Sequence, residues 1–165
     1  MSRTLILGVD PGLKGAACVL ECADGNPSVL LLADLPVVRF SDGRVKNRLD
    51  GASLAQMLAP FAGDVRMAVV ERVGARPGEA ASGAFSFGYT SGVIAGALGA
   101  LEIPITLVQP AVWKRAMGLA SADKDAARAR AIELFPVLAS DLARKKDHDR
   151  AEAVLMAEHG RRTQL

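Results

Sequence analysis

Hydrophobic residues in this chain fall into short runs separated by turn residues, a pattern that predicts alternating strands and helices. Runs of strand length end at turn signals, of which Asp10-Pro11-Gly12 is the first, whereas Leu54, Leu58 and Phe61 recur at helical spacing. The predicted strands are residues 4–9, 15–21, 28–35, 65–70 and 103–108. The predicted helices are residues 53–61, 85–101, 111–117, 122–135 and 148–160.

The order of these elements predicts an α/β fold with a mixed sheet. Three strands in succession form an opening antiparallel meander, and the later alternation of strands with helices implies parallel strands with helices packed on the sheet. Polar, basic residues 39–50 and the Gly-, Ala- and Pro-rich residues 74–83 are expected to form loops, the second of them mobile. Since no repeat or boundary is evident, we expect residues 1–165 to form one domain.

One predicted helix is unusual because Gly88, Gly92 and Gly96 recur at every fourth position and leave one face nearly bare backbone. Glycine in a helix is unfavourable by about 1 kcal/mol relative to alanine. We therefore expect this face to pack closely against another element.

The composition, 50% hydrophobic but only 4% aromatic, indicates an aliphatic core. No apolar run is long enough to cross a bilayer, and the apolar stretch in the first residues is too short for a secretory signal. We therefore expect a soluble, cytoplasmic protein without a membrane partner. Cys18 and Cys22 offer too few ligands for a structural zinc site and are interpreted as reduced thiols, packed in the core.

The net charge of +2 is a weak indication of nucleic-acid binding, but the basic residues are clustered. A positive surface around an acidic cleft suits an enzyme that acts on a polyanion. His159, with two arginines after it, is expected to lie in an exposed tail. The candidate DNA-binding residues are Arg44, Lys46, Arg48, Arg72, Arg76, Lys145 and Lys146.

Four carboxylates fall at the ends of predicted elements rather than on solvated faces. Asp10 and Glu71 follow apolar runs, where an acid is costly to bury unless its charge is offset, and Asp149 and Glu152 lie one turn apart at a helix start. Acids at strand ends can converge in an open sheet. Four such carboxylates could hold a pair of divalent cations about 4 Å apart for phosphodiester cleavage.

Each acid also has an ordinary structural explanation. Asp10 belongs to a turn signature, and Glu71 could pair with a neighbouring arginine. Asp149 and Glu152 fit a helix capping box, with Asp147 as an alternative cap. What favours a common site is that three separate segments each deliver an acid to the end of an element.

Basic side chains could complete such a site. Lys114 and Lys124 could hold the scissile phosphate or stabilise its charge in the transition state, and His148 could transfer a proton. For each of the three, a solvated position on a helix is the alternative interpretation.

The chain resembles the RuvC-like Holliday-junction resolvases of the RNase H-like superfamily, and in particular those of phages and prophages. The resemblance spans nearly the whole sequence. It rests on four blocks, which are LGVDPGLKGAA, VVERV, LVQPAVWKRAMGL followed by ADKDAARARAIELFP, and DHDRAEAVLMAEHG.

The resemblance implies an RNase H-like mixed five-stranded sheet flanked by helices. It implies that Asp10, Glu71, Asp149 and Glu152 bind two Mg²⁺ ions, which Mn²⁺ can replace. It also implies a homodimer that makes paired symmetric nicks in four-way DNA junctions, with residues 87–101 as a candidate dimer surface. The two active-site lysines of the family match Lys114 and Lys124.

The sequence departs from the bacterial pattern in two ways. Glu152 stands where bacterial relatives commonly have Asp, and no aromatic residue follows Glu71 closely, although Phe85, Phe87 or Tyr89 could stack on unpaired bases instead. Other hypotheses are a nuclease for flaps, forks or RNA, a binding module without catalysis, and an actin-like phosphotransferase. The phosphotransferase hypothesis requires two domains, and the chain is too short to hold both.

Overall fold

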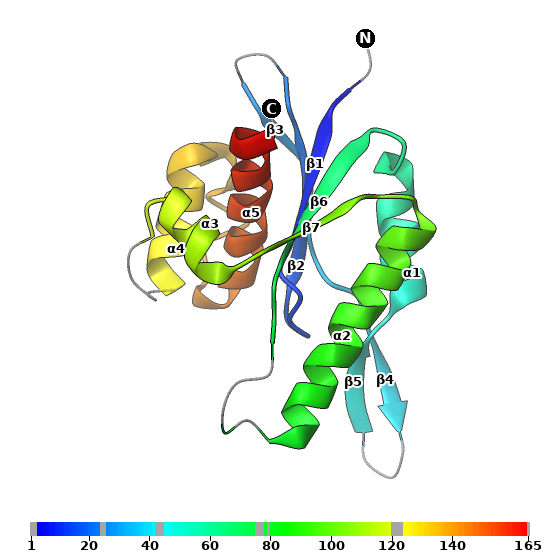
Figure 1. Cartoon of the computed structure of the whole chain (residues 1–165). Helices are drawn as coiled ribbons and strands as arrows, with labels where there is room; N and C mark the ends of the chain where they lie inside the picture. Colours follow the sequence, from blue (N-terminus) through cyan, green and yellow to red (C-terminus); the bar gives the residue numbers. More distant parts are fainter. Residues whose placement is uncertain are drawn as a thin grey trace.

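The central element of the fold is a five-stranded mixed sheet with strand order β3-β2-β1-β6-β7 (Figure 1). The computed structural model describes residues 3–23, 26–41, 45–74, 78, 80–119 and 124–164. The meander pairs β1–β2 and β2–β3 antiparallel, while β1–β6 and β6–β7 pair parallel, as predicted. The strands are β1 (Leu5–Val9), β2 (Ala16–Glu21), β3 (Ser28–Asp34), β6 (Val65–Glu71) and β7 (Ile105–Val108).

Helices cover both faces of this sheet (Figure 1). One face is covered by α1 (Gly51–Leu58) and α2 (Ala81–Ala100). The other is covered by α3 (Pro110–Ala116), α4 (Lys124–Leu134) and α5 (His148–Gln164). Short 3₁₀ turns occupy Ala59–Phe61, Pro136–Leu138 and Lys145–Asp147. Within the described part of the chain, no helix has both the length and the apolar character needed to cross a membrane.

The alternation of side chains along β1 divides the core into two layers. Leu5 and Leu7 belong to the cluster under α1 and α2, whereas Ile6 belongs to the cluster under α5. All three are fully buried. This double burial explains why the strand is a continuous apolar run in the sequence.

Helix α5 lies unusually close to β1 because small residues face each other across the contact. A Cβ placed on Gly8 would lie 2.1 Å from the Ala153 carbonyl oxygen and 2.5 Å from the Ala157 nitrogen. A Cβ on Gly160 would lie 2.6 Å from a methyl group of Val69. These contacts fix the depth at which α5, and every side chain it carries, sits over the sheet.

The expected loop at residues 39–50 is instead a β-hairpin. Strands β4 (Val37–Ser41) and β5 (Val45–Leu49) pair antiparallel, and Val38 lies opposite Arg48. The flanking valines and the Asp-Gly dipeptide at positions 42–43 are hairpin signals that outweigh the polar character of the segment. Asp50 then accepts hydrogen bonds from the nitrogens of Ala52 and Ser53, so α1 begins two residues earlier than predicted.

Two helices extend beyond their predicted bounds. Helix α2 begins at Ala81, inside the segment that was expected to be a loop. Helix α5 continues to Gln164, and the expectation of an exposed tail was wrong because His159 is only 8% exposed. The buried Glu158 carboxylate accepts hydrogen bonds from Arg161 and Arg162, which holds the end of the helix together.

The glycine face of α2 is open, contrary to the expectation that it packs against another element. Gly88, Gly92 and Gly96 are exposed. Among the described residues, no atom outside the local helix backbone lies within 4 Å of the position that a Cβ would take at any of the three. The cost of these glycines is therefore not offset by contacts inside the described chain.

Candidate active site

Three acidic side chains from the two ends of the sequence meet at one edge of the sheet. Asp10 directly follows β1, and Asp149 and Glu152 lie in the first turns of α5. One carboxylate oxygen from each lies within 4.8 Å of the others, and all three residues are partly buried. The structure thus brings together three of the four acids singled out from the sequence.

The backbone around Asp10 is held in a tight turn. The Gly12 nitrogen donates to Asp10 Oδ1 at 3.4 Å, and the Gly15 nitrogen donates to the Gly12 carbonyl at 2.9 Å. A Cβ on Gly15 would lie only 2.0 Å from the Asp10 carbonyl oxygen, so the turn needs glycine at this position. The same acid therefore has both a role in a turn and a place in the cluster.

The negative charges of the clustered acids repel one another. Burial raises the pKa of Asp10 from 3.8 to about 8, with further contributions from the charges of Asp149, Glu152 and Glu71. A divalent cation between the carboxylates would remove this repulsion. Carboxylate oxygens are also the donors that Mg²⁺ and similar hard cations prefer, so the residues fit such an ion.

Glu71 lies near this group but is held by a different partner. Val9 and Val70 pair in the parallel register of β1 and β6, so Asp10 and Glu71 leave the sheet at the same edge. Glu71 is not part of the 4.8 Å group. Its Oε2 accepts a hydrogen bond of 2.8 Å from the indole nitrogen of Trp113.

Trp113 is the residue of the site that the sequence analysis did not single out. Its side chain is fully buried in the core under α5, and its Nε1–H orients Glu71. A buried tryptophan needs an acceptor for its N–H, so the sequence could have indicated that Trp113 has a hydrogen-bond partner. The sequence could not name Glu71 as the acceptor, because 42 positions separate the two residues.

Of the two lysines, Lys114 reaches the cluster. Its Nζ lies 3.1 Å from Glu152 Oε1 and 5.1 Å from the centre of the Trp113 ring. The interpretation as a solvated helix position is therefore wrong for Lys114. Lys124 begins α4, but its side chain lies outside the described residues.

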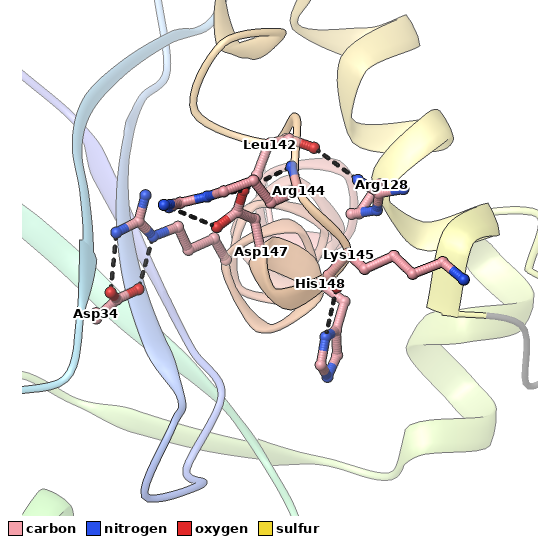
Figure 2. A network of polar contacts seen from close by, with 8 residues as sticks. Asp34, Arg128, Leu142, Arg144, Lys145, Asp147 and His148 are labelled. Carbon is pink, nitrogen blue, oxygen red and sulfur yellow. Dashed lines mark hydrogen bonds and ion pairs between the residues drawn. The ribbon is translucent and has the colours of Figure 1, made fainter.

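His148 bridges the start of α5 and the cluster. Its Nδ1 faces the Lys145 carbonyl oxygen at 3.1 Å (Figure 2), and its Nε2 lies 2.8 Å from Asp149 Oδ1. Both ring nitrogens thus face oxygen atoms. The residue is placed to hold the orientation of Asp149, in addition to the proton transfer considered from the sequence.

A polar network around the first turn of α5 explains why Asp147 is separate from the cluster. The Asp147 carboxylate accepts from the backbone nitrogen of Arg144 at 2.8 Å and from its guanidinium at 2.9 and 3.1 Å (Figure 2). These bonds hold the pKa of Asp147 below its usual range. Arg150 meanwhile donates to both oxygens of Asp34, at the end of β3.

The candidate DNA-binding residues are only partly described. Arg72, Lys145 and Lys146 are exposed, the two lysines in the turn that precedes α5. The guanidinium of Arg48 lies 5.2 Å from the centre of the Tyr89 ring. Arg44, Arg76 and the side chain of Lys46 lie outside the described residues.

Comparison with known proteins gives structural relatives only. No family model matches the sequence, and no curated protein matches it. RuvC of T. thermophilus in complex with a Holliday junction substrate superposes with a TM-score of 0.63 at 15% identity, over 98% of this chain and 97% of that one. This chain has a RuvC-like fold.

A second structure agrees with this assignment. Thermus thermophilus RuvC superposes with a TM-score of 0.54 at 16% identity, over 96% of each chain. The RuvC-like fold confirms the predicted mixed five-stranded sheet flanked by helices. At these identities the comparison concerns the fold, so the roles of individual residues are argued from the geometry of this chain.

Proposed function

We propose that this protein is a metal-dependent, structure-selective endodeoxyribonuclease that resolves four-way DNA junctions by paired symmetric nicks. The observation that carries the proposal is the meeting of Asp10, Asp149 and Glu152 within 4.8 Å at the sheet edge of a RuvC-like fold. Burial and the charges of the neighbouring acids raise the pKa of Asp10, an arrangement that is unfavourable in the absence of a cation and argues against a purely structural role.

The metal ligands in this proposal are Asp10, Asp149 and Glu152, with Glu71 completing the set beside Asp10. Two Mg²⁺ ions are the proposed cofactors, with Mn²⁺ as a substitute. Such ions, when bound, polarise the phosphate and make water a nucleophile near neutral pH. The side chain of Glu152 is longer than that of Asp, and its position in the 4.8 Å group supports it as a ligand despite this difference.

The other residues of the site act on charge and orientation. Lys114, 3.1 Å from Glu152, is placed to stabilise negative charge on a phosphate held at the acids. Trp113 fixes the orientation of Glu71 through its indole N–H. Lys124 is proposed as the second lysine of the site on the strength of the sequence resemblance.

Branched DNA and a second copy of the chain are the proposed partners. One structural relative of this chain is itself in complex with a Holliday junction substrate. The exposed basic residues Arg72, Lys145 and Lys146 support contact with the DNA backbone. The open glycine face of α2 supports a homodimer, because a twofold interface needs one self-complementary surface on each copy.

The proposal is tested with an end-labelled four-way junction, a flap, a replication fork and a linear duplex of the same sequences, each with Mg²⁺ or with chelator. We expect paired nicks in the junction only, in the presence of metal, and a rate reduced by about 10³-fold or more in Asp10→Asn. The matched control is Asp64→Asn, which changes an exposed acid outside the site and should cut at the wild-type rate.

Other outcomes would point to the other hypotheses. Metal-dependent cutting of flaps, forks or RNA in preference to junctions would keep the site and change the substrate. Binding of junctions without cleavage in Mg²⁺ or Mn²⁺ would contradict the nuclease and favour a binding module. Transfer of a phosphoryl group from ATP to a sugar would favour a phosphotransferase.

A further inference from the structure

Asp147 is a buried acid that lies beside the acid cluster without belonging to it. Its side chain is only 3% exposed, although it ends the short 3₁₀ turn Lys145–Asp147, whose two lysines are exposed. A carboxylate is unfavourable to bury unless hydrogen bonds and an opposite charge replace its hydration. The contacts that make this burial possible therefore identify what the carboxylate holds in place.

Arg144 neutralises the buried charge and closes the turn around it. Its backbone nitrogen donates to Asp147 Oδ2 at 2.8 Å, and its guanidinium donates to Oδ2 at 3.1 Å and to Oδ1 at 2.9 Å (Figure 2). The Asp147 nitrogen in turn donates to the Arg144 carbonyl at 2.9 Å. Because these hydrogen bonds join residues only three positions apart, the peptide groups between them have little freedom.

The chain that enters this turn is tied to another helix. Leu142 is fully buried, and its carbonyl accepts a hydrogen bond of 3.1 Å from the guanidinium of Arg128 in α4 (Figure 2). Two residues later the chain reaches Arg144. The turn is thus held by α4 on one side and continues directly into α5 on the other, so its peptide groups have a fixed place relative to both helices.

Within the turn, the carbonyl of Lys145 faces the ring of His148. The carbonyl oxygen lies 3.1 Å from His148 Nδ1 (Figure 2). A carbonyl oxygen can only accept, so the contact is a hydrogen bond when Nδ1 carries the proton. A fixed carbonyl therefore selects the nitrogen that is protonated and the angle of the ring, as backbone carbonyls do for histidines at metal sites.

The other side of the ring faces a proposed metal ligand. His148 Nε2 lies 2.8 Å from Asp149 Oδ1, and the two side chains are 19% and 18% exposed. Asp149 is one of the three acids whose oxygens lie within 4.8 Å of one another. The orientation of Asp149 in the cluster is thus linked, through one ring, to the carbonyl that the turn holds.

We propose that Asp147 is a positioning residue of the metal site, which acts on Asp149 through the Lys145 carbonyl and the His148 ring. Both oxygens of Asp147 accept from Arg144, and Asp147 is outside the 4.8 Å group, so it does not act as a ligand. The role rests on the metal site of the proposed function. Loss of Asp147 should misplace one ligand without removing any.

The affinity of the DNA-free protein for Mn²⁺, measured by calorimetric titration, tests this role. In Asp147→Asn the amide NH₂ group faces a donor of Arg144 whichever way it is turned, so the turn should loosen. We expect Mn²⁺ affinity to fall about three- to tenfold, at or below the loss typical of groups that contact a metal ligand directly. Arg144→Gln removes the guanidinium from the other side of the pair and should lower the affinity in the same way.

The matched control is Asp141→Asn. This substitution removes the same charge at an exposed position before the turn, where the side chain takes no part in the bonds to Arg144. Its Mn²⁺ affinity should equal that of the wild type. An equal loss in Asp141→Asn and Asp147→Asn would show that net charge, and not the turn, sets the affinity, and it would overturn the proposal.

A double-mutant cycle separates positioning from general damage to α5. In a His148→Ala background the link between the turn and Asp149 is absent, so Asp147→Asn should lower Mn²⁺ affinity by less than about twofold. Its effect on the unfolding free energy should persist in that background, because the bonds between Asp147 and Arg144 do not involve the ring. An undiminished loss of Mn²⁺ affinity would contradict the proposed route through His148.

Nitrogen NMR of the histidine rings gives a readout that is independent of metal binding. The chain has two histidines, so His159, near the other end of α5, serves as an internal reference. The ¹⁵N signals of His148 in the metal-free wild type should show a proton on Nδ1. Asp147→Asn should shift these signals and leave those of His159 unchanged. If the His148 signals do not move, the turn does not hold the ring and the proposal is wrong.

Failure of this role and failure of the nuclease are distinguishable. If the wild type binds Mn²⁺ and cuts junctions but Asp147→Asn binds Mn²⁺ normally, only the positioning role is wrong. If the Mn²⁺ affinities follow the expected pattern but no branched DNA is cut, the positioning role stands and the nuclease is wrong. If the wild type does not bind Mn²⁺, both are wrong.

Discussion

Arg150 joins Asp34 through two hydrogen bonds of 2.6 and 2.9 Å, one to each carboxylate oxygen. Arg150 lies between the two cluster acids of α5, and Asp34 is the last residue of β3. Within the sheet, Asp34 pairs with Ala16 at the far side of the turn that begins at Asp10. The pair therefore ties the helix that carries two of the acids to the strands that position the third.

Breaking this pair should loosen the site more than the fold. Asp34 is 63% exposed, so Asp34→Asn should lower the free energy of unfolding by no more than about 1 kcal/mol. We expect Mn²⁺ affinity, measured by calorimetric titration, to fall about tenfold, because groups that orient metal ligands influence affinity at this scale. Arg3→Ala removes an exposed pair with Glu21 instead and should leave Mn²⁺ affinity unchanged. Equal losses in both variants would contradict the positioning role.

Removing the indole N–H of Trp113 should affect Glu71 specifically. Trp113→Phe keeps a buried ring but leaves the carboxylate without this donor, so we expect urea denaturation to show a loss of about 1.5–3 kcal/mol. Cleavage should slow as well. In a Glu71→Gln background the same substitution should cost less, and a double-mutant cycle measures the difference. A coupling energy of zero would show that the bond does not contribute.

The close approach of α5 to β1 predicts a marked effect of one methyl group. Gly8→Ala would place a Cβ 2.1 Å from the Ala153 carbonyl oxygen, so α5 must move away from the sheet. We expect a loss of about 1–3 kcal/mol or more in unfolding free energy, together with weaker Mn²⁺ binding. Gly99→Ala, where no described atom outside the local helix backbone lies within 4 Å of the added Cβ, should be neutral or stabilise by up to about 1 kcal/mol. Normal metal binding in Gly8→Ala would show that the close approach of α5 to the sheet does not determine the geometry of the metal site.

The stability of the metal-free protein should fall as pH rises. The pKa of Asp10 is raised from 3.8 to about 8 by burial and by the neighbouring acids. Between these values the folded protein keeps a proton that the unfolded chain has released, so the unfolding free energy decreases with pH. The full shift corresponds to at most about 6 kcal/mol.

Urea denaturation in chelator between pH 5 and pH 8 measures this decrease. Asp10→Asn, which is neutral throughout, should lose most of the slope, and Mg²⁺ should restore stability to the wild type at pH 8. A wild type whose unfolding free energy is independent of pH in chelator would contradict the electrostatic account of the cluster. Asp64→Asn should keep the wild-type slope.

The open glycine face of α2 predicts where a dimer closes. At Gly92 no described atom outside the local helix backbone lies within 4 Å of the position of an added Cβ, so the fold should tolerate Gly92→Arg while the dimer dissociates. Sedimentation velocity should then show a monomer, and paired nicks should become single nicks. Asp64→Arg, at an exposed position outside α2, is the control and should remain dimeric. A dimer that survives Gly92→Arg would place the interface elsewhere.

The sequence predicted most of the sheet because β1 and β6 are buried on both faces and are therefore continuous apolar runs. It also indicated Asp10 and Glu71, since each acid stands directly at the end of such a run. The sequence did not show which side chains contact these two acids. Trp113 binds Glu71 from 42 positions away, and a contact of this range leaves no local signal.

The hairpin was missed for a different reason. Its strands contain basic and polar residues, and that composition favoured a loop, although the Asp-Gly dipeptide at 42–43 predicts a tight turn between two strands. For α2, the glycine spacing indicated a face that another element could approach closely. The sequence alone did not show whether that element belongs to the same chain. The structure leaves that face open among the described residues.

The acid cluster joins position 10 to positions 149 and 152, so it unites the first strand with the last described helix. During synthesis on a ribosome, Asp10 emerges long before α5, and closing so long a loop is among the slower steps of folding. The nascent chain therefore has no complete set of acids until α5 has been made and has docked at Gly8. Under the proposed function, nuclease activity would therefore appear only after the whole sheet has formed, because a chain arrested before α5 could not cut DNA.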